Sequence, residues 1–299
     1  MPAIEHIRNT AAALKDPRGE TRKWTLLAHD AIGKAGDAVF YSDVRQSREL
    51  RGFTDDEIAS SIGHIAVILD RNRTFVKDRK IPSERAHELG AKRVVDLLDD
   101  FSSLPIPHIS LWGFSVSNWG RKPGERDRIF SEIAKTLDTI QDKLREKNIR
   151  FRHIGYDKPH MAQVGNKDGA TTTGVVQLPD YLLKKFEDFE EMTMYNTGQN
   201  LNLLIDYNIE YERYAREGTC VTGEEILRLP DGYVLKPADL VLRTGENERH
   251  GIHTSAFGMI QEGQNTTIRG IKTPLPALRR KEIVRAVQAK LQTTLNGGK

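Results

Sequence analysis

The sequence predicts an α/β protein: a single domain with a mainly parallel central sheet flanked by helices, preceded by an N-terminal extension. From residue 63 onward, short apolar runs alternate with helix-length amphipathic segments, which is the pattern of β-α-β units. Residues 1–62 lack that rhythm. We therefore expect an extension at 1–62, largely helical, followed by one domain at 63–299, a length that can bury a substantial core.

The strand candidates are short, apolar and separated by enough residues for a helix. Parallel strands need such long connections, because a two-residue turn cannot join them. The five candidates are residues 64–69, 108–114, 150–154, 200–206 and 238–243.

Two segments have the apolar spacing of a helix that packs one face against a core. The clearest covers about 125–147, and a second covers about 84–101. The stretch GNKDGATTTG at 165–174 is rich in glycine, threonine and charge, so we expect a flexible polar insertion there and no regular element. The apolar side of these helices would cover the predicted sheet.

Composition excludes several classes of protein. The chain carries 45 basic and 42 acidic residues, a net charge of +3, which argues against a general nucleic-acid binder. Its one cysteine, Cys220, excludes an internal disulfide framework and a cysteine-rich zinc site, and favours a reducing compartment. We find neither the apolar core of a signal peptide nor an 18-residue apolar stretch, so we expect a soluble, cytoplasmic protein.

Polar side chains gather just beyond the predicted strands, where ligands of open parallel sheets bind. Arginine binds phosphate through two parallel hydrogen bonds, and Mg²⁺ is usually held by one or two carboxylates together with substrate phosphate oxygens. The pattern therefore predicts a phosphate or diphosphate site with a divalent metal. The residues concerned are Asp70, Arg71, Asn72, Arg73, Ser115, Asn118, Trp119, Arg121, Asp206, Arg243 and Arg249.

Taken singly, each of these residues has a plain structural interpretation. An Asp after a strand is more often a helix N-cap than a metal ligand. Arg243 and Arg249 could form ordinary surface ion pairs, Trp119 could belong to the core, and His64 and His87 could be structural. Only their coincidence at several strand ends favours a functional site.

The order of the motifs resembles the cis-prenyltransferases, the undecaprenyl and dehydrodolichyl diphosphate synthase family. The resemblance runs over about residues 63–290. It is carried by HIAVILDRNRTF (64–75), by the register of Ala86, His87 and Gly90, and by FSVSNWGR (114–121), LNLLIDYNIE (201–210) and DLVLRTGENER (239–249).

The resemblance implies a prenyltransferase that uses Mg²⁺. In the family, diphosphate leaves an allylic prenyl diphosphate, and isopentenyl diphosphate or a related acceptor attacks the allylic carbon and loses a proton. The resemblance also implies a homodimer, and a lipid product leaves open a transient association with membranes. By position, it assigns the metal to Asp70 and Glu262, catalysis to Asp70, Ser115 and Asn118, and substrate binding to Arg71, Asn72, Arg73, Phe75, His87, Trp119, Arg121, Arg243, Arg249 and Ser255.

Several positions depart from the family pattern. Arg71 stands where the family has a loop glycine, and Thr74 and Ser83 stand where it has phosphate-binding arginines. Asp206 replaces an Asn, and Glu246 replaces a Gly in the acceptor segment. The departures favour a specialised enzyme over a housekeeping one.

Three alternatives stay open at this stage. One is an irregular-coupling, short-chain or cyclising terpene synthase on the same fold. Another is a non-catalytic partner subunit of a prenyltransferase; such subunits lose the metal-binding Asp, so the presence of Asp70 argues against it. A protein that only binds prenyl diphosphates is the third. The apolar helix at 125–147 would wall a tunnel for the prenyl chain or serve as an ordinary core helix, and the sequence does not separate the two.

Overall fold

We describe the protein from a computed structural model, which covers residues 50, 52–216, 227–229, 232–246 and 266–296. The chain divides into two units, Met1–Arg51 and Gly52–Lys299, and the fold below is that of the second. Most of the predicted extension lies outside the described residues, so its boundary at residue 62 stays a prediction. Helix α3 (Asp55–Ser61) falls within that range and is closed at its start by a reciprocal Thr54–Glu57 capping box.

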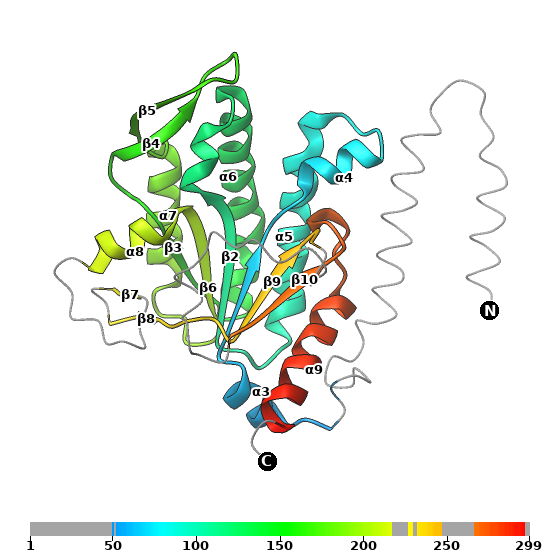
Figure 1. Ribbon diagram of the computed structural model, residues 1–299. Coiled ribbons are helices and arrows are strands. Elements are labelled where there is room, and N and C mark those ends of the chain that lie inside the picture. Colours follow the sequence, from blue (N-terminus) through cyan, green and yellow to red (C-terminus); the bar gives the residue numbers. More distant parts are fainter. Residues whose placement is uncertain (1–49, 51, 217–226, 230–231, 247–265, 297–299) are drawn as a thin grey trace. The chain divides into compact units, whose positions relative to one another are not determined.

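The centre of the domain is a six-stranded sheet with the order β10-β9-β1-β2-β6-β3 (Figure 1). All of its strand pairs are parallel, which confirms the predicted fold class and the five predicted strands. The strands are β1 (His64–Ile68), β2 (His108–Ser115), β3 (Arg150–Ile154), β6 (Asn200–Tyr207), β9 (Leu240–Thr244) and β10 (Thr267–Ile271).

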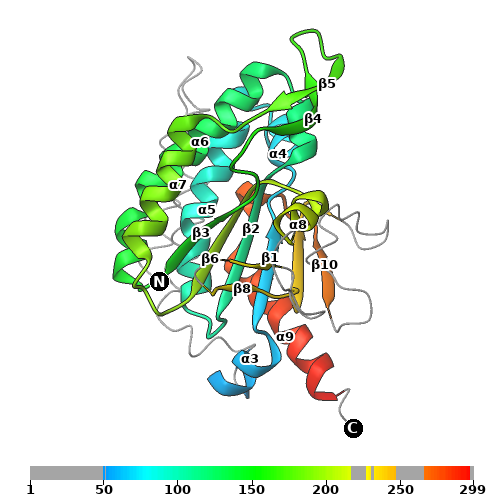
Figure 2. The ribbon, with the colours of Figure 1, turned by 90° about the vertical axis from the view of Figure 1, so that its left-hand side faces the viewer.

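Three long helices, α5 (Ala86–Ser102), α6 (Pro123–Glu146) and α7 (Asp180–Thr193), lie together on one side of the sheet (Figure 2). Both predicted helices are confirmed. Helix α6 starts with a proline at its first position and buries Ile129, Leu137, Ile140 and Leu144, as the apolar spacing predicts.

The opposite side carries smaller elements. Helix α8 (Ile209–Arg216) and the two-stranded pair β7 (Leu227–Arg228) and β8 (Val234–Leu235) contribute buried side chains to a cluster with Trp112 and Tyr207 of the sheet. Helix α9 (Arg280–Asn296) is not among these smaller elements. It packs against β9, β10 and α3, and its Arg280 meets Asp100 and Ser103 at the end of α5, on the side of the three long helices. Within the described part of the chain, we find no helix of the length and apolarity that crossing a bilayer requires.

The prediction of a flexible insertion at 165–174 is wrong. Strands β4 (His160–Gly165) and β5 (Thr171–Val176) form an antiparallel hairpin. Between them the side-chain oxygen of Asn166 accepts hydrogen bonds from the backbone N–H groups of Asp168 and Ala170, and Gly169 takes a φ of +93°. The glycine and threonine that suggested disorder therefore supply a tight turn and a β-branched strand.

Three short elements begin where the parallel strands end. Helix α4 (Asn72–Asp78) follows β1 after a three-residue link, and the 3₁₀ helix η3 (Val116–Gly120) follows β2 directly. The 3₁₀ helix η6 (Leu275–Ala277) follows β10, and the N–H of its Leu275 donates to the carbonyl of Asp70. These connections bring the polar residues of β1, β2 and β9 to one edge of the sheet.

Candidate functional site

A polar cavity of about 440 Å³ lies at the carboxyl edge of the sheet. Its wall includes Asp70 and Arg243, which are 173 positions apart in the sequence. The predicted site residues on its wall are Asp70, Arg71, Asn72, Arg73, His87, Ser115, Asn118, Arg121 and Arg243. The structure therefore brings most of the predicted set together.

The carboxylate of Asp70 is fixed at the cavity wall by its neighbours. One oxygen accepts the backbone N–H of Arg71 at 2.6 Å, and the other accepts Nη2 of Arg243 at 3.0 Å. The backbone N–H of Asp70 donates to the hydroxyl of Thr244 at 2.9 Å, and this hydroxyl lies 2.9 Å from the Asp70 carbonyl. The side chain stays 41% exposed, so the carboxylate is ordered and still open to a ligand.

Arg71 adopts the left-handed conformation that a glycine would take, with φ +68° and ψ +22°. The stem of its side chain lies against Gly245, where a Cβ would overlap with Cγ of Arg71. Gly245 itself has a φ of +72°. The loop thus keeps a glycine-like backbone, while the arginine stem spans the ends of β1 and β9.

Asn72, at the start of α4, is wedged against helix α5. A Cβ on Gly90 would lie 2.5 Å from Oδ1 of Asn72, so only a glycine leaves room for this amide. Among the described residues Oδ1 is buried without a hydrogen-bond partner. A buried acceptor without a partner is unfavourable by about 1–3 kcal/mol, which suits an atom that meets a ligand.

Glu125 gathers three cationic or titratable side chains on one side of the cavity. Its Oε1 lies 2.6 Å from Nη1 of Arg121, 3.4 Å from Nε2 of His87 and 3.8 Å from Nη1 of Arg73. Burial opposes ionisation of Glu125, but the hydrogen bond and charge of Arg121 and the charge of Arg73 outweigh it and lower its pKa. Burial, and then the charge of Arg121, lowers the pKa of His87.

Sequence reasoning missed Glu125, although its spacing was informative. It lies four residues after Arg121, at the position where a helical carboxylate pairs with a preceding arginine. Glu125 thus balances part of the positive charge on its side of the cavity.

The element η3 carries Ser115 and Asn118 in a reciprocal cap. Oδ1 of Asn118 accepts the backbone N–H of Ser115 at 3.0 Å, and the Ser115 side chain accepts the backbone N–H of Asn118. The hydroxyls of Ser115 and Ser117 are 2.7 Å apart. Local hydrogen bonds therefore set the orientation of these two predicted catalytic side chains.

Two predicted substrate-binding residues lie away from the polar cavity. Trp119 is 6% exposed and packs edge-on against Phe114 at a ring distance of 5.5 Å. Phe75 lies on α4 beneath the guanidinium of Arg79, 4.0 Å from its ring centre. A direct contact of either ring with substrate stays a prediction.

The segment that the resemblance assigns to the acceptor, residues 239–249, is described only up to residue 246. Nε of Arg243 lies 3.2 Å from Oε2 of the buried Glu246, so its guanidinium is held between two carboxylates, those of Glu246 and Asp70. Arg249, Ser255 and Glu262 lie outside the described residues, and their roles stay predictions.

The residues at this edge fit a magnesium ion that is bound mostly by phosphate. Among the described residues there is no group of three or more His, Cys, Asp or Glu side chains that could hold a metal ion. Of the carboxylates that the structure describes, that of Asp70 is the one on the wall of the polar cavity, and it is partly exposed. Mg²⁺ commonly takes one or two carboxylates and completes its shell with water and substrate phosphates, so one carboxylate is sufficient on the protein side.

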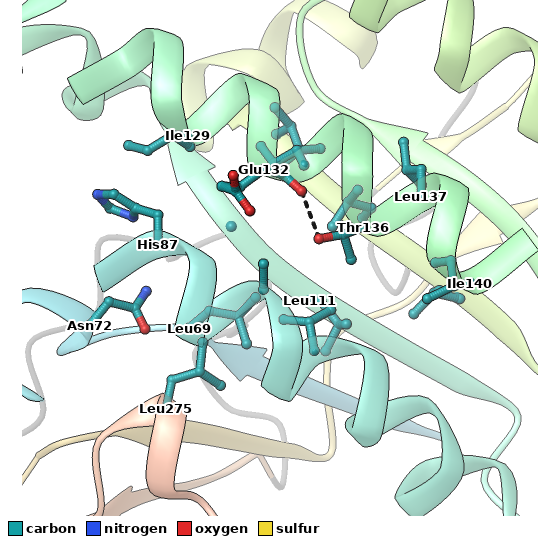
Figure 3. Close-up of a pocket in the computed structure, with 18 of the residues that line it drawn as sticks. Leu69, Asn72, His87, Leu111, Ile129, Glu132, Thr136, Leu137, Ile140 and Leu275 are labelled. Atoms are coloured by element: carbon teal, nitrogen blue, oxygen red, sulfur yellow. Dashed lines mark hydrogen bonds between the residues drawn. The ribbon is translucent and has the colours of Figure 1, made fainter. Parts of the chain in front are cut away.

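An apolar cavity of about 90 Å³ adjoins the polar one, between α5 and α6 and above β2 and β6 (Figure 3). Figure 3 shows His87 and Asn72 at one end and Ile140 toward the other. Glu132 and Thr136 of α6 also line it. The two cavities share part of their wall, which consists of Leu69, Asn72, His87, Gly113 and Ile129. Together they offer a charged compartment joined to a hydrocarbon-like one.

Comparison with known proteins gives a consistent result. Residues 68–293 match the family model of undecaprenyl diphosphate synthase. Dehydrodolichyl diphosphate synthase 1 of Arabidopsis thaliana is 31% identical over 149 residues, 50% of this chain and 44% of the plant protein. An isoprenyl transferase of Aquifex pyrophilus is 28% identical over 193 residues, 62% of this chain and 76% of that protein.

A solved structure has the same fold. Lavandulyl diphosphate synthase from Lavandula x intermedia, in complex with dimethylallyl diphosphate, superposes with a TM-score of 0.57 at 19% identity. The superposition covers 79% of this chain and 97% of that one. The sequence match covers less than half of the length of the plant relative. The structural superposition, by contrast, covers nearly all of the lavandulyl enzyme.

Proposed function

The chain belongs to the undecaprenyl diphosphate synthase family, and from this premise we propose that it transfers a prenyl group from an allylic prenyl diphosphate and releases diphosphate. One observation carries the proposal: the basic cavity and the apolar cavity share a wall. An allylic prenyl diphosphate has the matching chemistry, because a dianionic or trianionic head is joined to a hydrocarbon tail.

The basic side chains are proposed to bind the allylic diphosphate. Arg73 and Arg121 can donate to its oxygens in place of Glu125, which now balances their charge. A side chain that is already ordered loses less entropy when a ligand takes over its hydrogen bonds. His87 faces the same oxygen of Glu125 and is proposed to contact the head group as well.

Asp70 is proposed to hold Mg²⁺, with Glu262 as a second ligand implied by the family resemblance. When bound there, Mg²⁺ supplies positive charge that stabilises the leaving diphosphate. The chain's own part is to aim the Asp70 carboxylate through the N–H of Arg71 and the guanidinium of Arg243.

The acceptor is proposed to bind beside Arg243 and Arg249, as the resemblance implies. It is isopentenyl diphosphate or a related acceptor, whose double bond attacks the allylic carbon and then loses a proton. Ser115 and Asn118, which are fixed by the cap of η3, are proposed to orient the allylic carbon and the diphosphate. We further propose a homodimer and a cytoplasmic location, with membrane contact limited to a lipid product.

A second candidate function is short-chain, irregular or cyclising chemistry on the same donor. Two observations favour a specialised outcome. The apolar cavity encloses about 90 Å³, less than the roughly 150 Å³ of an engineered cavity that accepts benzene. Glu246 also places a buried carboxylate against the acceptor arginine. A non-catalytic subunit is disfavoured, because Asp70 is present and is oriented toward the cavity.

The test is incubation of the full chain with Mg²⁺, isopentenyl diphosphate, and dimethylallyl, geranyl or farnesyl diphosphate in turn. Released diphosphate is measured, and products are identified by mass spectrometry. We expect turnover that EDTA abolishes and that Asp70→Ala reduces by at least a hundredfold without lowering the melting temperature. Asp78→Ala, at the exposed end of α4, is the matched control.

The outcomes separate the candidates. Long products indicate chain elongation, while five- or ten-carbon transfers without further growth indicate the second candidate. Turnover that persists in EDTA contradicts the assignment of Asp70 to a metal. If no donor yields diphosphate, the proposed activity is wrong.

A further inference from the structure

The carboxylate of Asp206 joins two elements that are distant in the sequence. It is the second-to-last residue of strand β6, has a left-handed backbone conformation with φ +57°, and is fully buried. One oxygen accepts Nε1–H of Trp119 at 2.7 Å, and the other meets Nε2 of His160 at 2.8 Å. Trp119 belongs to η3, and His160 opens the β4–β5 hairpin.

The chemistry of a carboxylate determines which groups of this bridge donate hydrogen bonds and which group accepts them. An ionised carboxylate only accepts hydrogen bonds, so His160 must present a proton on Nε2. Removal of one partner from a buried carboxylate is strongly destabilising, since the remaining charge is left without compensation. Asp206 therefore links η3 to the hairpin through one buried carboxylate.

His160 is enclosed on its other side. Its ring stacks on Tyr156 with 3.9 Å between centres and 18° between planes, and 10% of its side chain is exposed. The backbone N–H of Tyr156 donates to the carbonyl of Asp206 at 3.1 Å. Stacking and backbone pairing thus fix the imidazole in the orientation that the carboxylate needs.

A second, independent tie joins the hairpin to the end of η3. Nη1 of Arg126 lies within hydrogen-bond distance of three carbonyl oxygens: 2.6 Å from Trp119, 2.8 Å from Arg121 and 3.0 Å from Gly165. A Cβ on Gly165, the last residue of β4, would overlap with the carbonyl of Gly120. The hairpin backbone therefore lies directly on the segment between Asn118 and Arg121.

We propose that the β4–β5 hairpin is a positioning element of the substrate site, and that His160 and Asp206 are the positioning residues through which it acts. They fix Trp119 and the backbone of residues 119–121, and thereby the place of Asn118 and of the Arg121 guanidinium on the cavity wall. The inference rests on the proposed function, because Arg121 is there assigned to the allylic diphosphate.

A purely structural role predicts a different outcome from a positioning role. Loss of stability alone would change both substrates' KM values together, or neither of them. Displacement of Arg121 would weaken binding of the allylic diphosphate. Arg243, which is assigned to the acceptor, would stay in place, because strand β9 and the carboxylates of Asp70 and Glu246 hold it. A split between the two KM values is therefore the signature.

The experiment compares His160→Ala with the conservative His160→Gln, whose amide can donate to the same carboxylate oxygen. We expect His160→Ala to raise the KM of the allylic diphosphate at least tenfold with the acceptor KM within twofold. We expect His160→Gln to return the allylic KM to within threefold of wild type. Asp100→Asn is the matched control, because it weakens a buried ion pair with Arg93 about one helix length from the cavity and should lower stability only.

A binding measurement keeps the inference separate from turnover. Titration calorimetry with inorganic diphosphate should show at least tenfold weaker binding to His160→Ala and near wild-type binding to His160→Gln. If wild type binds diphosphate but turns over no donor, the proposed function fails while this pattern still decides the inference. Equal KM and Kd values in wild type and His160→Ala, parallel changes in both KM values, or a wild type without diphosphate affinity would each overturn it.

Discussion

Replacement of Gly90 by Ala tests whether the position of Asn72 matters to the reaction. Gly90 is buried in helix α5 and lines the apolar cavity. A Cβ there would lie 2.5 Å from Oδ1 of Asn72, whereas ordinary van der Waals contact begins at 3.4 Å. The amide must therefore retreat from α5 by about 0.9 Å, the difference between these two distances.

The effect on stability should be small and favourable. Ala in a helix interior is favoured over Gly by about 1 kcal/mol. The retreat of Asn72 breaks no hydrogen bond of Oδ1 among the described residues, because that atom has no partner there. We expect the free energy of unfolding to rise by between zero and about 1 kcal/mol, which is a gain of up to roughly 2–4 °C in melting temperature for a domain of this size.

The effect on activity should be large and of opposite sign. Asn72 lies on the shared wall of both cavities, and a shift of about 1 Å in a substrate-positioning group can lower the rate about a hundredfold. The assay is kcat/KM for the allylic diphosphate, with thermal unfolding on the same preparations. Gly124→Ala is the matched control, since a Cβ in that first turn of α6 would meet only Nη1 of Arg128, at 3.9 Å.

Two results would refute this reasoning. If Gly90→Ala keeps kcat/KM within threefold of wild type, the placement of Asn72 is irrelevant to the reaction. If its melting temperature falls by more than about 3 °C, the clash is not relieved by the movement of one side chain, and a loss of activity would report damage to the fold.

Three further predictions concern single residues. Arg71→Gly should leave the free energy of unfolding within about 1 kcal/mol of wild type, because relief of the strained left-handed backbone at Arg71 offsets the added freedom of the unfolded chain. The same variant should increase elongation with isopentenyl diphosphate. Unchanged products would contradict a role for this loop. Glu246→Gln removes one of the two carboxylates that pair with Arg243. We therefore expect the KM of a diphosphate acceptor to fall about tenfold, with the KM of the allylic diphosphate unchanged. A rise in the acceptor KM would show that the carboxylate assists acceptor binding. Burial lowers the pKa of His64 from 6.5 to about 4, so between these pH values the unfolded chain binds a proton that the folded chain does not. Urea titrations should therefore show the free energy of unfolding falling as pH decreases from 6.5 to 4, by on the order of 3 kcal/mol from this residue. A free energy of unfolding that does not change over this pH range would be inconsistent with a neutral buried imidazole.

The parallel sheet could be predicted because its strands are buried on both faces and therefore read as continuous apolar runs. Strand β10 was missed because it is not buried in this way. It is an edge strand with the sequence TIRGI and four partly exposed residues, so its pattern carries little apolar signal. The β4–β5 hairpin was missed because a turn built by Asn166 and Gly169 has the same composition as a flexible loop.

The site could be predicted as a set of strand-end residues, since the fold class alone places those ends together. What the sequence could not supply was the pairing among them. Glu125 lies four positions beyond Arg121, but its contacts with His87 and Arg73 depend on how α5 and α4 pack against α6. Asp206 is recognisable as a strand-end carboxylate and as a departure from the family's Asn. Its partner His160 begins strand β4, just before the segment taken for a flexible insertion, where no strand was predicted.

The narrow apolar cavity between α5 and α6 has a mechanical consequence for substrate selection. Protein interiors are densely packed and compress little. A donor tail that fits the existing space leaves the two helices in contact, whereas a longer tail must separate them. The work of that separation is subtracted from the tail's own hydrophobic gain of about 0.8 kcal/mol per methylene. For the proposed donor we therefore expect a graded preference for tail length, which depends on how stiffly the helix pair is joined and not on a single blocking residue.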